Sequence, residues 1–534
     1  MKPDGKLFRR FAMQFYLVSV TLAGIYALAH YLRLQSEPLP LRILWMAVGT
    51  GLLALAILIQ RSRIRNGTDR PAGGSGKHEK TAEIVEAALM VAVGAVLRFL
   101  IIRNLPMQPK SDFEVYYRMA DMLSRGTLSE EGAWYCDYVS TFPHVLGYPA
   151  VLSVVFSIFG TGIFAAQAFN LLLQMLACLL TWRTARLLGG RLSGLIALGI
   201  TAFLPSTILY SNILGSEALF TCLLMTGVWL FTRLTTLHAG PRWANPWISL
   251  SGLILLGLVL AFSSFVRPMG IIFLIAAVIC IFTIGRNGKE DPEQKKTLPE
   301  RLTDRRWKQS LILVAVYFLG SFLLSSYTAH TIRREPAGAS VSFGYNLLVG
   351  LNRQASGAWN PEDAEYLQAG LDSLGTATAA QKACRDLAFE RLKNVEGLSS
   401  LLVEKFKYLW GNDDYGATWN IAFLGEQGQL TPERNSFLNV MTDISDIWYI
   451  FLLLGAWYCG RIMRRREPDA GYALILTFCG TVALHLLVEQ QNRYHYFALY
   501  LLAVLAGIGF RTLIRKAGGR IAGTKKTAPS IENQ

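Results

Sequence analysis

Long apolar segments separated by short basic connections dominate the pattern of this chain. A helix needs about 20 mostly apolar residues to cross the hydrocarbon core of a bilayer. By that measure the sequence predicts an all-α polytopic membrane protein with about twelve transmembrane helices. The predicted spans are 11–32, 41–60, 83–103, 163–187, 191–210, 213–237, 247–265, 268–285, 309–330, 445–463, 470–489 and 494–514.

The basic connections predict the orientation, because loops rich in Lys and Arg remain on the cytoplasmic side. They are residues 1–10, 61–80, 183–191, 286–308, 461–466 and 511–526. If both termini are cytoplasmic, every one of these connections falls on that side. We therefore expect a multi-pass cell-membrane protein, and the compact basic loops fit a bacterial inner membrane.

The apolar segment 144–160 is short for a span. If it crossed the membrane, every later loop would be inverted and Arg464, Arg465 and Arg466 would lie outside. We therefore interpret it as a re-entrant or juxtamembrane segment that lines a protein cavity. A short transmembrane helix is the alternative.

Polar stretches divide the chain into regions. Residues 331–444 are too polar to cross a membrane, and their helical patterns predict a mostly helical extracytoplasmic lid, which at this length is usually functional. The predicted regions are an N-terminal hairpin with a basic linker (1–80), a core (81–330) with a first outer loop (104–143), the lid (331–444), C-terminal helices (445–515) and a basic cytoplasmic tail (516–534).

Composition agrees with this organisation. Only 17% of the residues are charged, whereas soluble domains carry about 25%. The net charge of +15 is concentrated in the loops between apolar runs, so it reflects membrane orientation and not nucleic-acid binding. The seven cysteines have no metal-ligand spacing, and most lie in apolar runs, which indicates packing.

The strongest candidate for chemistry is the acidic stretch Ser111-Asp112-Phe113-Glu114, which follows the predicted span 83–103. Ionisable groups at a membrane boundary are functional candidates. Asp112 is placed to act as a general base that accepts the proton of an attacking hydroxyl. Glu114 is a second catalytic acid, a metal ligand or a solvated side chain, and an exposed acidic loop without function is the alternative for both.

Three further residues near the short segment 144–160 are candidate substrate contacts: Asp137, His144 and Tyr148. An imidazole at this boundary can hydrogen-bond a sugar or a phosphate. The alternatives are a structural cap for His144 and interfacial anchoring for Tyr148.

Two arginines are candidates for binding a phosphate, since the guanidinium offers a fork of donors. Arg493 is the first choice, because the turn around it is dense in polar and aromatic residues. Arg267 lies between two apolar runs at the outer boundary, and snorkelling to the interface is its alternative role. The neighbours of Arg493 that we expect to contact substrate are Glu489, Tyr494 and His495.

From about residue 85 to 515 the chain resembles bacterial members of the GT-C superfamily, specifically the family-39-like protein mannosyltransferase group, which includes the lipid A aminoarabinose transferases. The resemblance rests on short motifs in the expected order. They are SDFE after a span, TFPHVLGYP before a short apolar helix, GSEALF at the start of a span, VRPMG, and the late QNRYHYF.

The resemblance implies a GT-C-like fold, a polyprenyl-phosphate-linked sugar as donor, and an inverting single displacement. By position, Asp112 matches the family's catalytic base and Arg493 its arginine near the donor phosphate. The family's acidic pair is often adjacent, whereas Phe113 here separates Asp112 from Glu114. The role of Glu114 and any dependence on metal therefore stay open, and the N-terminal hairpin and the lid have no matched counterpart.

We therefore predict an integral-membrane glycosyltransferase that moves a sugar to an acceptor hydroxyl on the extracytoplasmic side. No cofactor is expected, and a divalent metal is possible but not indicated. The expected partners are a polyprenyl-phosphate-linked sugar, an acceptor glycan, lipid or protein, and membrane lipids, with no nucleic acid.

Two other classes of protein remain as alternatives. A transporter or lipid flippase of the cell envelope would also need charges and a cavity, but transporters usually contain internal repeats, and we find none. A structural scaffold related to the enzymes would not need Asp112 and Arg493 to face one cavity.

Overall fold

A computed structural model describes residues 5–33, 77–236, 246–284, 305–393, 396–466 and 469–524, and every regular element in these ranges is a helix. The predicted span 41–60 lies outside the described residues, as do most of the linker 61–80 and of the loop 286–308. The prediction of an all-α polytopic membrane protein is confirmed.

Seven helices of the described chain are long and apolar enough to cross a membrane, judged by length and composition. They are α1 (Gly5–Arg33), α3 (Lys77–Asn104), α8 (Ile163–Gly189), α11 (Glu217–Thr236), α15 (Arg305–Ile332), α21 (Pro432–Met463) and α23 (Tyr496–Thr524). Shorter apolar helices include α12 (Pro246–Val266), α13 (Gly270–Thr283) and α22 (Gly471–His485).

The predicted span 191–210 is broken. Helix α9 (Arg191–Ala202) ends before Pro205, which begins α10 (Pro205–Leu209), and the two parts are bent by 45°. Proline cannot donate the next helical hydrogen bond, so the helix ends there. The buried Arg98 of α3 donates to the freed carbonyl oxygens of Thr201 and Ala202, at 3.2 and 2.7 Å.

The short segment 144–160 forms a 3₁₀ turn, η1 (Pro143–Leu146), followed by α7 (Gly147–Phe159). Helix α7 has 13 residues and is about 20 Å long at 1.5 Å per residue, which is less than the ~30 Å of a hydrocarbon core. It ends at Gly160, whose φ of 83° lies in the region that favours glycine.

The region predicted as a lid consists of two parts. Helices α16 (Gly344–Gly350), α17 (Pro361–Leu374) and α18 (Ala377–Lys393) share a small apolar core of their own. Helices α19 (Leu398–Trp410) and α20 (Tyr415–Glu426) instead pack into the main core. Helix α21 begins at Pro432, inside the predicted lid, because Thr431 caps it by accepting a hydrogen bond from the amide of Arg434.

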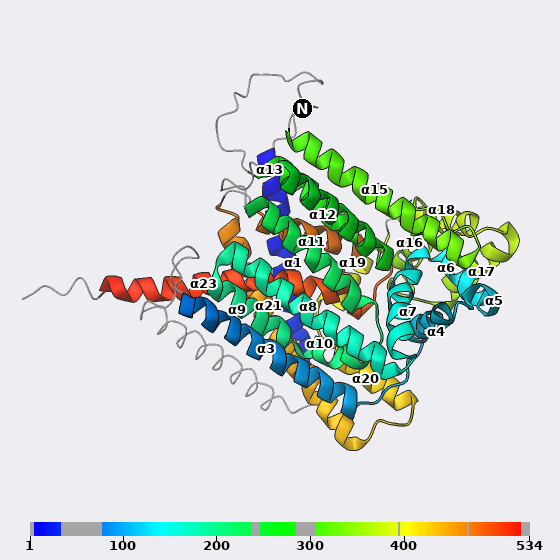
Figure 1. Ribbon diagram of the computed structural model, residues 1–534, viewed down its shortest axis with the longest axis horizontal. Coiled ribbons are helices and arrows are strands. Elements are labelled where there is room, and N and C mark those ends of the chain that lie inside the picture. Colours follow the sequence, from blue (N-terminus) through cyan, green and yellow to red (C-terminus); the bar gives the residue numbers. More distant parts are fainter. Residues whose placement is uncertain are drawn as a thin grey trace, which may run out of the picture.

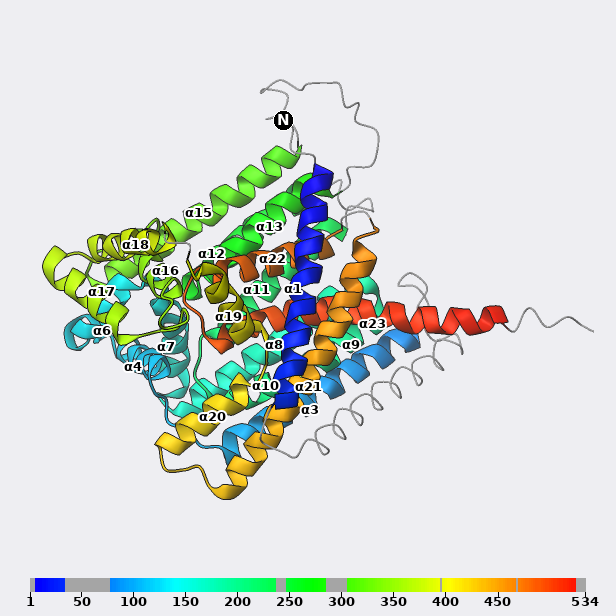
Figure 2. The same cartoon turned by 180° about the vertical axis from the view of Figure 1, so that it is seen from behind.

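The small helices gather at one end of the bundle of long helices (Figure 1). This end contains α4 (Asp112–Arg125), α5 (Leu128–Glu131) and α6 (Ala133–Thr141) together with α7 and α16–α18. Helix α23 passes through the middle of the bundle and extends on the opposite side, while α1 lies along α21 (Figure 2).

One buried lysine joins the lid region to the turn before η5 (Asn492–His495). The ammonium of Lys405 in α19 donates to the carbonyl oxygens of Gly350 and Val488, at 2.7 and 2.8 Å. A Cβ at position 350 would lie 2.2 Å from the carbonyl oxygen of Leu487, so only glycine permits this approach. The turn that carries the predicted phosphate ligand is therefore fixed to α16 and α19.

Candidate active site

The acidic stretch forms the start of a helix. Ser111 has a φ of 54°, in the region that favours glycine, and α4 begins at the next residue, Asp112. A carboxylate in the first turn interacts favourably with the partial positive charge of the helix N-terminus. The backbone conformation at Ser111 thus sets the direction in which the chain enters α4 at Asp112.

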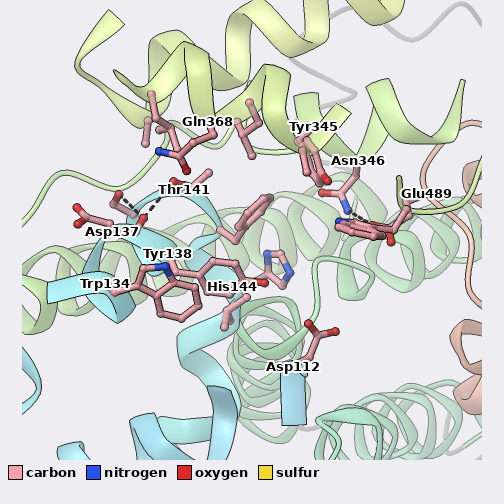
Figure 3. A pocket seen from close by; sticks show the side chains of 18 of the residues that line it. Asp112, Trp134, Asp137, Tyr138, Thr141, His144, Tyr345, Asn346, Gln368 and Glu489 are labelled. Carbon is pink, nitrogen blue, oxygen red and sulfur yellow. Dashed lines mark hydrogen bonds between the residues drawn. The ribbon is translucent and has the colours of Figure 1, made fainter. Parts of the chain in front are cut away.

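Asp112 faces a cavity of about 1240 Å³, which lies between α4, α6 and η1 on one side and α16–α18 on the other (Figure 3). Its wall is rich in ionisable and aromatic side chains from segments far apart in the sequence. The ionisable residues are Asp112, Asp137, His144, Arg267, Arg334, Glu335, Asp372, Glu489 and Arg493, and the aromatic ones are Phe113, Tyr116, Trp134, Tyr138, Phe142, Tyr345, Trp359, Trp419 and Tyr494.

The predicted base and the predicted phosphate ligand are in direct contact. The Arg493 Nη2 atom donates to the Asp112 Oδ2 atom at 2.7 Å. The Arg493 side chain is only 4% exposed, whereas that of Asp112 is 39% exposed. The guanidinium is therefore fixed by the fold, and the carboxylate remains accessible from the cavity.

Glu217, the first residue of α11, holds both predicted phosphate ligands. Its Oε1 atom lies 2.5 Å from Arg267 Nη1 and 3.7 Å from Arg493 Nε. The three side chains are largely buried, and burial of charge is tolerated when the charges are paired. Glu217 therefore keeps two guanidinium groups side by side at one wall of the cavity.

Aromatic faces hold the guanidinium planes. Arg493 lies over the rings of Phe113 and Trp419, at 4.7 and 5.0 Å from their centroids, and Arg267 lies over Tyr494 at 5.1 Å. Cation–π contacts of this kind orient a guanidinium without using its donors. The donors of both arginines thus remain directed along the wall of the cavity.

The backbone at Gly147 packs closely against that at Phe265, and this contact places Arg267 near His144. A Cβ on Gly147 would lie 2.4 Å from the carbonyl oxygen of Phe265, so glycine is required where η1 meets the end of α12. Burial, together with the positive charge of Arg267, lowers the pKa of His144 to about 4. His144 is therefore neutral at pH 7 and can exchange hydrogen bonds with an uncharged hydroxyl.

Glu489 is the acid of the cavity that titrates near neutrality. Its Oε2 atom accepts a hydrogen bond from Asn346 Nδ2 at 3.2 Å (Figure 3), and its amide donates to the carbonyl oxygen of Asn346 at 2.7 Å. Burial, and then the charge of Asp112, raise the pKa of Glu489 to about 7. This carboxyl group is therefore partly protonated under ordinary conditions.

Replacing Glu489 with Gln is expected to flatten the dependence of stability on pH. The folded protein holds this proton up to about pH 7, whereas the unfolded chain loses it near 4.5, so the free energy of unfolding falls as the pH rises between these values. The loss amounts to up to about 3 kcal/mol. Thermal unfolding of Glu489→Gln between pH 5 and 8 should show the smaller slope. The exposed Glu390→Gln variant should keep the wild-type slope, and equal slopes in all three proteins would contradict the assignment.

Three predicted site residues do not line the cavity. Residues two apart on a helix point about 200° away from each other, so Glu114 points away from Asp112 and from the cavity. It pairs instead with Arg118, at 2.7 Å. Asp112 and Glu114 therefore cannot share a metal ion. The hydroxyl of Tyr148 is buried and donates to Asn170 Oδ1 at 3.0 Å. His495 is fully buried, with its Nε2 atom 3.0 Å from Asp413 Oδ1.

Three others of the predicted substrate contacts do line it: Asp137, His144 and Glu489. Tyr494 also lines the cavity, as a support for Arg267. Asp137 pairs with Arg334 at 2.7 Å and is well exposed.

The structure adds residues that the sequence did not single out. Trp134 and Tyr138 are stacked at 5.2 Å with an angle of 8° between their planes, and Trp134 is 58% exposed. Their spacing of four residues on one helix is a signal that was available. Tyr345 and Asn346 of α16 and Trp419 of α20 also reach the cavity, and no local pattern marks them.

The fold and the cavity together define a class: a multi-pass, all-α membrane protein with paired carboxylate and guanidinium groups in a large cavity at one end of its helices. Residues 143–297 match the family described as Dolichyl-phosphate-mannose-protein mannosyltransferase. This match confirms the resemblance to the family-39-like group of the GT-C superfamily. The matched segment contains Glu217 and Arg267, whereas Asp112 and Arg493 lie outside it.

Solved structures with a similar arrangement include two of an archaeal oligosaccharyltransferase from Archaeoglobus fulgidus. Its apo form is 12% identical, with a TM-score of 0.44, and the alignment covers 84% of this chain and 52% of that one. The same enzyme, AglB, in complex with an inhibitory peptide and a dolichol-phosphate is 12% identical, with a TM-score of 0.43 and coverages of 86% and 53%. The chain thus spans about half the length of these enzymes.

A bacterial structure, ArnT from Cupriavidus metallidurans bound to undecaprenyl phosphate, is 15% identical, with a TM-score of 0.33 and coverages of 83% and 81%. No curated protein matches the chain in a sequence search. Because these TM-scores lie below 0.5, the class of the protein rests on the family match and on the residues of the cavity.

Proposed function

We propose that this protein is a membrane glycosyltransferase that moves a sugar from a polyprenyl-phosphate donor to an acceptor hydroxyl, with inversion, on the extracytoplasmic side. The observation that supports it most is the 2.7 Å contact between Asp112 and Arg493 in one cavity. A displacement at a sugar carbon by a hydroxyl needs a group that accepts the proton and a group that stabilises the departing anion, both in the same cavity. The family description, which names a dolichyl-phosphate-linked mannose, supports the class of donor.

The donor phosphate would bind at the wall formed by Arg493 and Arg267. Negative charge grows on the phosphate as the bond to the sugar breaks, and guanidinium groups fixed in a low-dielectric site stabilise that charge without reorganising. Arg493 is positioned by Glu217, Phe113 and Trp419 before any substrate arrives. A phosphate that takes over the Nη2 donor of Arg493 releases the carboxylate of Asp112.

The released Asp112 carboxylate would accept the proton of the acceptor hydroxyl as its oxygen attacks the anomeric carbon. The phosphate leaves from the opposite face, so the configuration inverts. Tyr345, Asn346 and Gln368 of the lid region line the far wall (Figure 3), which supports a role in excluding water from the reacting sugar. The exposed ring of Trp134 offers an apolar face to a sugar or to the acceptor.

The decisive assay uses tag-free protein in detergent, with a set of radiolabelled polyprenyl-phosphate sugars and without a sealed vesicle. A transferase is expected to convert at least one of them to polyprenyl phosphate plus a glycosylated acceptor, and mass spectrometry of the co-purified lipid narrows the choice of sugar. A transporter or flippase would leave every donor chemically intact and act only across a sealed bilayer. That second outcome would overturn the proposal.

A further inference from the structure

A cluster of ionisable side chains lies outside the catalytic cavity, where α1 meets α20 and α21. It consists of His30, Asp414 and Asp446, which each offer one ligand atom within 4.8 Å of the others. None of the three lines the cavity that contains Asp112. They come from α1, from the residue before α20, and from the middle of α21, so the fold and not a local motif brings them together.

Asp446 fixes the orientation of His30. Its Oδ1 atom accepts the amide proton of Asp413 at 3.0 Å, and its Oδ2 atom lies 2.9 Å from His30 Nδ1. Both carboxylate oxygens are thus in use, and the imidazole donates through Nδ1. A carboxylate that binds one ring nitrogen in this way leaves the other, Nε2, with its lone pair available, which is the usual arrangement behind a metal-ligating histidine.

The Nε2 atom of His30 faces two further polar groups. Asp414 Oδ2 lies 4.0 Å away, and Asp414 is only 6% exposed. The Nδ2 atom of Asn412 lies 3.4 Å from Nε2, and the Oδ1 atom of Asn412 is buried without a hydrogen-bond partner among the described residues. A buried carboxylate and a buried, unpaired amide oxygen beside this imidazole are costly unless a cation or a proton compensates them.

The neighbouring acids make compensation more necessary. Asp413 is already paired, with Ser206 and with His495, so neither of these groups serves Asp414. His30 is therefore a single base facing two buried acids, Asp414 and Asp446.

We propose that His30 Nε2 and the Asp414 carboxylate bind a divalent transition-metal ion, zinc being the best match. Asn412 Oδ1 becomes a further oxygen donor when the amide group turns by 180°, so that Oδ1 takes the place of Nδ2 beside His30. Zinc bonds to histidine nitrogen and carboxylate oxygen are about 2.0–2.2 Å long, so two ligands 4.0 Å apart can share one ion. Mixed nitrogen and oxygen ligands favour zinc over magnesium or calcium. The His30 side chain is 32% exposed, which gives the ion a route from solvent.

The ion would act as a clamp and not as a reagent. It would link α1 to the start of α20, and through Asp446 to α21. The amide of Asp413 bonds to Asp446, and the carboxylate of Asp413 contacts His495, which is two residues from Arg493. Metal binding is therefore expected to stabilise the turn that carries the phosphate ligand, although the site itself does not depend on the proposed transferase activity.

Tag-free protein treated with a chelator tests the proposal. Titration calorimetry and elemental analysis should show one zinc ion per chain, and the melting temperature should rise by several degrees at zinc concentrations about 100-fold above the dissociation constant. His30→Gln and Asp414→Asn should each weaken zinc binding by at least about tenfold, the lower limit for losing one ligand. The exposed His330→Gln variant of α15 is the matched control and should bind zinc like the wild type.

The Asp414→Asn variant distinguishes the metal site from an ion pair made by a protonated His30. For a metal site, removing the buried carboxylate should leave the zinc-free melting temperature unchanged or higher while the response to zinc disappears. For an ion pair, the same change should lower the melting temperature, and no stoichiometric zinc should bind. The second pattern, or zinc binding retained in both His30→Gln and Asp414→Asn, would overturn the proposal.

Discussion

Replacing Asp112 with Asn is expected to lower the rate of sugar transfer by about 10²–10⁴-fold, the contribution of a general base, while the donor still binds. Asparagine keeps the shape of the side chain and cannot accept the proton. The change also removes the ion pair with Arg493, so the dissociation constant of the donor should stay equal or decrease. Initial rates and donor binding, both measured on purified protein, check the two parts separately.

The matched control for this variant is Asp121→Asn. Asp121 lies on the same helix, but it is paired with Arg125 at 2.7 Å and does not line the cavity. It should retain wild-type rates. An Asp112→Asn protein with undiminished turnover would remove the assignment of the base, and a protein that no longer binds donor would assign Asp112 to binding instead.

Replacing Arg493 with Lys is expected to lower kcat by about 10²–10³-fold, the effect of losing one fixed donor to a developing anion. Lysine keeps the positive charge, but it cannot contact Asp112, Gln491 and a phosphate with one planar fork. It also loses the stacking on Phe113 and Trp419. The KM for the donor should rise as well, and steady-state kinetics with varied donor measure both effects.

Arg118→Lys is the control for the change from Arg to Lys, since Arg118 is exposed and pairs with Glu114 outside the cavity. Elution of each variant as a single symmetrical peak in size-exclusion chromatography shows that the fold is intact. If Arg493→Lys kept a wild-type kcat, another group would have to stabilise the departing phosphate. The proposed role of Arg493 would then be wrong.

The hydrophobic pattern is a good guide to the helices, because each predicted span within the described residues is mostly helical. The bend at Pro205 was missed, since apolar character continues through it while the backbone hydrogen bonds do not. Helix α21 contains the predicted span 445–463 but begins earlier, at Pro432, because its first turns are polar and only the cap at Thr431 and Pro432 marks them. Hydropathy locates the apolar part of a helix and not its polar ends.

The sequence also indicated much of the cavity, but it did not indicate which way side chains point. Arg493 and His495 are neighbours in the chain, yet the 3₁₀ turn η5 places Arg493 against Asp112 and His495 in the interior against Asp413. Glu114 was grouped with Asp112 because a helix start at Asp112 was not foreseen. Walls built from distant segments, such as those with Trp419 and Asn346, become visible only in three dimensions.

The contact between Asp112 and Arg493 has a consequence for the kinetics of a two-substrate reaction. In the proposed mechanism Asp112 accepts the proton and Arg493 receives the anion, and in the empty protein these two groups are bound to each other, so neither is available for the reaction. We therefore expect a compulsory order, with the lipid-linked donor first and the acceptor second. Once the spent lipid departs the pair closes again, and no activated base is left facing solvent between turnovers.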